Sequence, residues 1–272
     1  MEIKVRYHTV LKTSEMSNLS SRIIDPSGPS QSVRLFHLEI NKITIAQLES
    51  KISAIKYTPP KKTLTEGFSK VESKAKRMRA EYQISFKVPI RYYADGEAKT
   101  RYYMSTEKGN ILINLTTKYV EVRGSDRLAR RFRRIFYSKF SDFNPVLDPL
   151  DLVENKSSKG FYSAIIKASE AKNKENTNIE HAVYTNVAAQ GLKSADFRGE
   201  YLQHKKEVTV YGTIHKGTIA MFSGTLTFPS NTSLKTAINC QKGSIQIFRT
   251  EDGILEKDIR WLIEQMVTAA NL

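Results

Sequence analysis

The sequence predicts an α+β fold, an antiparallel sheet with helices packed on one side. Consecutive strand-like runs are joined by turn residues, and an amphipathic helix closes each half of the chain. With 40% apolar and 10% aromatic residues, the chain has the composition of a packed globular protein. Its 272 residues accommodate one large domain or two of ordinary size, and we expect the halves 1–140 and 141–272 to join near 141–150.

In the first half, periodicity and turn residues define the elements, and Thr44 with Gln47 forms a capping-box pattern at a helix start. Residues 94–97 form a turn and so predict a hairpin. The expected elements are strands at 2–11 and 33–40 with a loop at 14–32 between them, a helix at 44–57, strands at 82–93, 99–106, 110–115 and 118–123, and a helix from Asp126 to about Phe140.

Residues 58–81 are predicted to form a mobile basic arm, with a short helix near 69–79. Pro59 and Pro60 end the preceding helix, and few apolar residues follow. The arm carries Lys61, Lys62, Lys70, Lys74, Lys76, Arg77 and Arg79.

In the second half, the same cues leave residues 178–206 unassigned. The expected elements are a helix at 161–174, a hairpin of 208–214 and 218–228, short strands at 237–240 and 244–248, and a closing helix at about 254–270. The two halves then share an order of helix, hairpin, two strands and helix, which is consistent with an internal duplication or with coincidence.

The first half's order of strand, helix, four antiparallel strands and helix resembles one repeat of the TATA-binding protein. The stretch KYVEVRGSDRLARRF (118–132) is similar to the last strand and helix entry of that repeat. The resemblance implies two related halves, but the loop at 14–32 and the arm at 58–81 depart from the family's pattern, and its paired wedge phenylalanines are not matched.

The charge is divided unevenly between the halves. Residues 1–140 contain 28 Lys and Arg against 13 Asp and Glu, a net of +15, whereas residues 141–272 contain 15 of each. A one-sided excess favours a surface for a polyanion, either a nucleic acid or an acidic protein. The neutral second half is expected to bind a protein partner, which would make the protein an accessory subunit of a nucleoprotein complex.

Two basic patterns supply the candidate site. On the helix at 126–140, four arginines lie opposite the apolar residues, and arginine suits phosphate contacts. In the first hairpin, basic residues alternate with tyrosines that either stack on bases or follow ordinary strand composition. The predicted nucleic-acid-binding residues are Arg127, Arg130, Arg131, Arg134, Lys61, Lys62, Lys74, Lys76, Arg77, Arg79, Arg91 and Arg101.

Enzyme signatures are not evident, and we expect no cofactor, catalytic residue or metal. The five histidines lack ligand spacing, and Cys240 is the only cysteine. A metal-dependent nuclease is the remaining enzymatic alternative, through Asp95, Glu97 and Lys99 or through Glu121 with Arg123. The lone cysteine, with no apolar run long enough for a signal peptide or membrane span, predicts an intracellular protein of the cytoplasm, nucleoid or nucleus.

Overall fold

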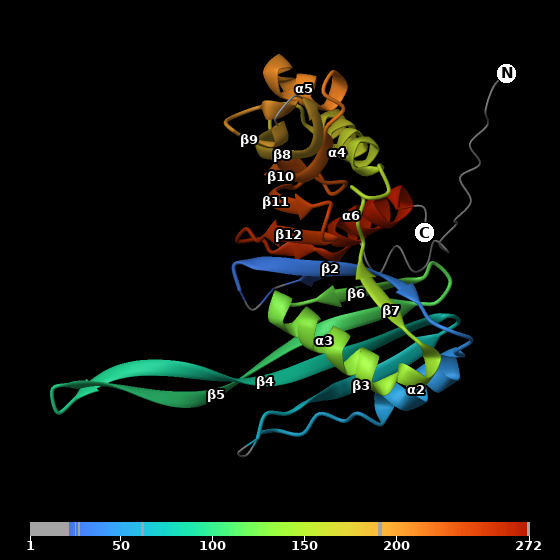
Figure 1. The fold of residues 1–272 in the computed structure, drawn as a ribbon, viewed down its shortest axis with the longest axis vertical. Coiled ribbons are helices and arrows are strands. Elements are labelled where there is room, and N and C mark those ends of the chain that lie inside the picture. The colour runs from blue at the N-terminus through green and yellow to red at the C-terminus, as the bar shows by residue number, and fades with distance from the viewer. Residues whose placement is uncertain (1–21, 25, 27, 61–62, 190–191, 271–272) are drawn as a thin grey trace.

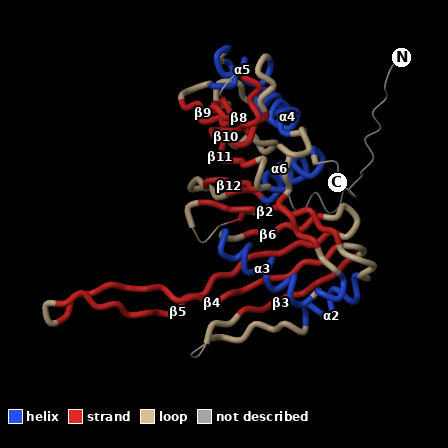
Figure 2. Tube along the Cα trace, viewed as in Figure 1, coloured by secondary structure: helices blue, strands red, loops and turns tan. Residues whose placement is uncertain are grey.

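The computed structural model describes residues 22–270 except 25, 27, 61–62 and 190–191 (Figure 1). A large antiparallel sheet, open at both edges, runs through both halves of the chain and has helices against it (Figure 2). In chain order the elements are β1 (Ile23–Ile24), β2 (Ser30–Glu39), α2 (Ile45–Ser53), β3 (Glu66–Lys74), β4 (Arg77–Ala94), β5 (Glu97–Asn114), β6 (Tyr119–Arg123), α3 (Asp126–Lys139), η1 (Ser141–Phe143), β7 (Val146–Pro149), α4 (Ser158–Lys172), β8 (Asn178–Ala189), β9 (Leu192–Arg198), η2 (Leu202–His204), α5 (Lys206–Thr213), β10 (Thr218–Thr227), β11 (Ser233–Asn239), β12 (Ser244–Phe248), β13 (Ile254–Leu255) and α6 (Glu256–Ala269).

Strand β2 lies at the centre of the sheet, whose order is β3-β4-β5-β6-β2-β12-β11-β10-β8-β9. One side of β2 pairs with β6, and the other side pairs with β12 and, further along, with β7. Two antiparallel meanders, β4-β5-β6 and β10-β11-β12, therefore meet the central strand from opposite sides. Each meander leads into a long helix, α3 or α6.

The helices of the two halves cover opposite faces of this sheet. In β2, Phe36 and Leu38 belong to the hydrophobic cluster under α2 and α3, whereas Val33 and Leu35 belong to the cluster under α4 and α6. Because successive strand residues point to opposite faces, the two clusters lie on different faces, called here the α3 face and the α6 face. The expectation that all helices pack on one side is therefore wrong.

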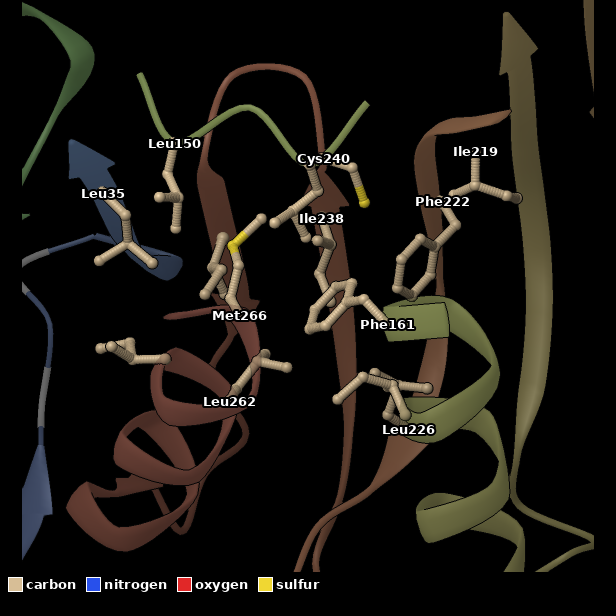
Figure 3. Close-up of a cluster of buried hydrophobic side chains, with 14 of the residues drawn as sticks. Leu35, Leu150, Phe161, Ile219, Phe222, Leu226, Ile238, Cys240, Leu262 and Met266 are labelled. Atoms are coloured by element: carbon tan, nitrogen blue, oxygen red, sulfur yellow. The ribbon is translucent and has the colours of Figure 1, made fainter. Parts of the chain in front are cut away.

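The core of the second half lies on the α6 face between α4, α6 and strands β10 and β11. Figure 3 shows Phe161 of α4 and Leu262 and Met266 of α6 directed toward Phe222 and Ile238 of the sheet. Cys240 is buried at the edge of the same cluster, and burial raises the pKa of its thiol well above the ordinary value. The sulfur is thus a packing group rather than a reactive thiolate.

Most expected elements are present, but three assignments are wrong. The arm at 58–81 contains strand β3 and the start of β4 instead of a short helix, because Phe68 packs on Tyr82 at a ring-centroid distance of 4.8 Å. The segment 208–214 lies in helix α5 and not in a hairpin strand. The separate strands expected at 99–106 and 110–115 are one continuous strand, β5. The strand expected at 2–11 lies outside the described residues.

Candidate nucleic-acid interface

The predicted basic residues do not form one surface. Four of them, Arg127, Arg130, Arg131 and Arg134, belong to helix α3 and are called here the α3 arginines. They lie on the side of this helix that points away from the sheet. The opposite side of the sheet carries Lys74, Arg77, Arg79 and Arg91. Arg79 is paired with Leu112, which belongs to the cluster of the α6 face, and the strand registers place the other three residues on the same side as Arg79. Arg101 is on the α3 side, Lys76 lies in the β3–β4 turn, and Lys61 and Lys62 fall outside the described part of the chain.

The α3 arginines are engaged with the protein itself. Arg131 and Arg134 form ion pairs with Glu66 at 3.5 and 3.0 Å. Arg127 places its guanidinium over the ring of Phe86, 3.9 Å from the centroid. These contacts offset the repulsion expected among like charges on one helix face without requiring an external polyanion.

A second group of cations shares the exposed side of β3, β4 and β5 on the α6 face. Alternate residues of β4 point to this side, and the registers with β3 and β5 place their neighbours beside them. We call this surface the basic face; its exposed cations are Lys70, Lys74, Arg77, Arg79, Lys87, Arg91 and Lys108.

The carboxylates of the basic face only partly balance its cations. Glu81 lies between Lys70 and Lys108, at 3.3 and 3.1 Å. Burial alone would raise the pKa of Glu81, but the two lysines outweigh burial and hold that pKa below its ordinary value. Glu72 is the other carboxylate on this side. Among the described residues, none makes an ion pair with the four cations along β4, namely Arg77, Arg79, Lys87 and Arg91.

The basic face ends at helix α6, where a buried ionic cluster joins the two halves. Arg123 donates to Glu121 at 2.5 Å and to both oxygens of Glu256 at 2.5 and 2.8 Å. Arg260 donates to Glu121 at 2.7 and 3.2 Å and to Glu256 at 3.2 Å. A hollow of about 370 Å³ lies beside the cluster. It is lined by Arg79 of the basic face and by all four residues of the cluster.

The arginines of this ionic cluster keep both of its carboxylates charged. Burial by itself would raise the pKa of Glu121 and of Glu256, but the two guanidinium groups outweigh burial and lower both values. Because two positive groups face two negative groups with their hydrogen bonds satisfied, the cluster is neutral and structural. It supplies an edge to the basic face rather than a free anion site.

Strands β4 and β5 continue beyond the sheet as a two-stranded ribbon. Pairing with β3 stops at Ile84 and pairing with β6 stops at Asn110. From Ser85–Thr106 to Ala94–Glu97, ten residue pairs have no further strand beside them in the register. Ser85 still bonds to Thr65 and Phe86 lies against Arg127, so the last eight pairs form the projecting part. Figure 1 shows this ribbon projecting away from the body of the protein. Asp95 and Gly96 have φ values of 57° and 79° and form its two-residue turn.

The two alternative sets of residues considered for nuclease chemistry lie in different parts of the structure. Asp95 pairs with Lys99 at 2.9 Å at the tip of the ribbon, whereas Glu121 is bound by two arginines inside the protein. Within the described ranges, no group of three or more His, Cys, Asp or Glu side chains is arranged to hold a metal ion.

The chain matches no protein-family model and has no significant match among curated proteins. None of the helices in the described ranges is long and apolar enough to cross a membrane.

The predicted binding residues did not include Lys70, Lys87 and Lys108 of the basic face, nor Glu256 and Arg260 at its boundary. The cations at 77, 79, 87 and 91 are all at odd positions of one strand, and that spacing would have placed them on one side. The pairing of Glu121 with a helix 139 residues later in the chain left no local signal.

Proposed function

We propose that this protein is a non-catalytic nucleic-acid-binding protein that contacts phosphates through the basic face. The observation that carries the proposal is the one-sided row of exposed cations along β4, supplemented by lysines of β3 and β5. Phosphate contacts of this kind set affinity and orientation without reading bases. The predicted role of Arg77, Arg79, Arg91 and Lys74 is kept, whereas the α3 arginines are assigned to intramolecular contacts.

The length of the row favours a nucleic acid over an acidic protein. Arg77 and Arg91 are 14 residues apart on one strand, which corresponds to about 48 Å at about 3.4 Å per residue. A standard protein interface of roughly 800 Å² per partner is only about 30 Å across. A polyanion with charges repeated along its length can follow the whole row.

The test is a salt titration of binding to duplex DNA. Replacing Arg77, Arg79, Lys87 and Arg91 with Gln removes four phosphate contacts, so the slope of log affinity against log salt should fall by about 3.6. The matched control replaces Arg127, Arg130, Arg131 and Arg134 with Gln, which changes the net charge equally and should leave the slope nearly unchanged. Thermal unfolding checks that both variants are folded.

Two results would contradict the proposal. Absence of nucleic-acid binding by the wild-type protein in low salt would favour an acidic protein partner. Equal loss of slope in the two variants would mean that net charge, and not the basic face, determines binding.

The proposed accessory role depends on the second half, whose neutral composition suits a protein partner better than phosphates.

We also propose that the two meander–helix units are related by duplication. The units β4-β5-β6-α3 and β10-β11-β12-α6 flank β2, and β6 and β12 both run antiparallel to it. A half-turn about an axis along β2 would exchange the two sides and the two faces, which accounts for helices on opposite faces. The resemblance of the first half to a TATA-binding-protein repeat belongs to this proposal.

A further inference from the structure

The projecting part of the β4–β5 hairpin, residues 87–104, has properties that a free surface rarely has. An isolated two-stranded hairpin is marginally stable in water, and this ribbon extends eight pairs, Lys87–Met104 to Ala94–Glu97, past the contacts of Ser85 with Thr65 and of Phe86 with Arg127. It also carries seven of the thirteen exposed large apolar side chains of the described residues. They are Val88, Ile90, Tyr92, Tyr93, Tyr102, Tyr103 and Met104. A partner that surrounds the ribbon would account for both features.

Both sides of the ribbon carry the same chemistry. Tyr92 and Tyr103 lie on the α3 side together with Lys99 and Arg101, where the Arg101 guanidinium lies over the Tyr103 ring at 5.3 Å. The other side carries Tyr93 and Tyr102 with Lys87 and Arg91, and Tyr93 is 83% exposed. Each side therefore has two tyrosines and two cations, which fits a partner that contacts both sides at once.

We propose that this ribbon inserts into the major groove of duplex DNA, an inference that rests on the proposed nucleic-acid binding. The major groove of B-form DNA is about 12 Å wide and admits a two-stranded ribbon. The eight pairs beyond Phe86 extend about 27 Å, which covers most of one helical turn of about 34 Å. The basic face is continuous with one side of the ribbon, so it contacts phosphates beside the groove that the ribbon occupies.

Other nucleic acids fit the ribbon less well. The major groove of an A-form RNA duplex is deep and narrow, which excludes a ribbon with side chains on both sides. A single strand needs aromatic rings on one platform, but adjacent tyrosines in Tyr92–Tyr93 point to opposite sides. Duplex DNA is the partner that uses both sides.

The decisive variant shortens the ribbon and leaves the sheet intact. Deletion of residues 88–93 and 98–103 removes six residues from each strand, so the pair Lys87–Met104 is followed directly by the Ala94–Glu97 pair and its turn. Pairing alternation is retained because an even number is removed. A second variant, R91Q/R101Q, keeps the length and removes one cation from each side.

Binding is measured in one buffer to duplex DNA of about 30 base pairs, to duplex RNA of the same sequence and to each single strand. The full-length protein should bind duplex DNA about tenfold more tightly than duplex RNA, the size of effect that one good groove contact produces. The shortened variant should lose that preference, and R91Q/R101Q should lose part of it. Dimethyl sulfate should methylate guanine N7 less in the wild-type complex than in the shortened variant's complex, since N7 lies in the major groove.

The outcomes separate this inference from the proposed function. Binding without preference for duplex DNA, or with N7 equally reactive in both complexes, overturns groove insertion while leaving phosphate binding in place. A preference for single strands that the shortened variant loses would assign the tyrosines to base stacking instead. No binding to any nucleic acid overturns both proposals.

Discussion

The guanidinium of Arg123, at the end of β6, donates to both carboxylate oxygens of Glu256, the first residue of α6, at 2.5 and 2.8 Å. The two residues are 133 positions apart, and both are buried. The pair therefore attaches the closing helix of the second half to the last strand of the first half. Arg260 and Glu121 complete the cluster, so each charge has an opposite neighbour.

Replacing Arg123 with Leu should lower the free energy of unfolding by about 3–5 kcal/mol, because two buried carboxylates would lose a shared partner. Urea unfolding at neutral pH measures the change. The control is Arg130→Leu on the exposed side of α3, where a change below about 0.5 kcal/mol is expected. Equal effects of the two substitutions would mean that the cluster does not couple the halves.

The same cluster predicts a loss of stability in acid. The arginines hold the pKa values of Glu121 and Glu256 below their ordinary values, against the effect of burial. The carboxylates thus contribute stability above the unfolded pKa of about 4.3, and this contribution is lost as pH falls toward the lowered folded values. Urea unfolding between neutral pH and about pH 3 should show this fall, with a shallower slope for Glu256→Gln. Parallel slopes would contradict the assignment.

The buried approach of β5 to β6 predicts a strict requirement for glycine at position 109. A Cβ added to Gly109 would collide with the backbone oxygen of Arg123, which cannot rotate away as a side chain can. Gly109→Ala should therefore destabilise the protein by several kcal/mol, more than the usual 0.5–3 kcal/mol of a single substitution. Gly28→Ala is a suitable control, since its added Cβ would meet no atom within 4 Å. Similar melting temperatures for the two variants would argue against close packing at this edge.

The sequence was most informative where local chemistry determines local structure. The capping box of Thr44 and Gln47 is present at the start of α2, where the backbone N–H of Gln47 donates to the Thr44 hydroxyl at 3.2 Å. The Asp95-Gly96 turn forms where expected, because glycine and aspartate adopt positive φ readily. Helices α3 and α6 follow their 3.6-residue patterns, since packing depends directly on that spacing.

Long-range packing explains what the sequence could not provide. Strand β3 has little apolar character of its own, and its strand conformation depends on pairing with β4 and on Phe68 packing against Tyr82 and Phe132. The opposite placement of α3 and α6 follows from which side of β2 each meander joins. The candidate site was predicted in part, because charge counting finds cations but does not distinguish strand sides.

The position of Glu66 allows the two basic surfaces to be distinguished by single carboxylate changes. Glu66 accepts from Arg134 at 3.0 Å and from the buried Tyr82 hydroxyl at 3.0 Å. Glu66→Gln should therefore destabilise the protein by about 1.5–3 kcal/mol, because a neutral amide replaces the charged acceptor in both bonds. The substitution also removes the carboxylate partner of Arg131 and Arg134 on α3. The affinity for duplex DNA should nevertheless stay the same, because α3 lies on the other face from the basic face. Glu72→Gln removes a carboxylate from the basic face itself.

Both substitutions remove one negative charge, so net charge cannot explain a difference between them. Glu72→Gln should raise affinity for duplex DNA at low salt, and the gain should shrink as salt screens the surface, while stability changes by less than about 0.5 kcal/mol. Fluorescence anisotropy at two salt concentrations and urea unfolding of each variant provide the measurements. Higher affinity from Glu66→Gln, with none from Glu72→Gln, would move the interface to α3 and restore the arginine helix as the phosphate-binding surface. The reverse pattern is expected because Arg79 pairs in register with Glu72 on β3, on the side that faces away from α3.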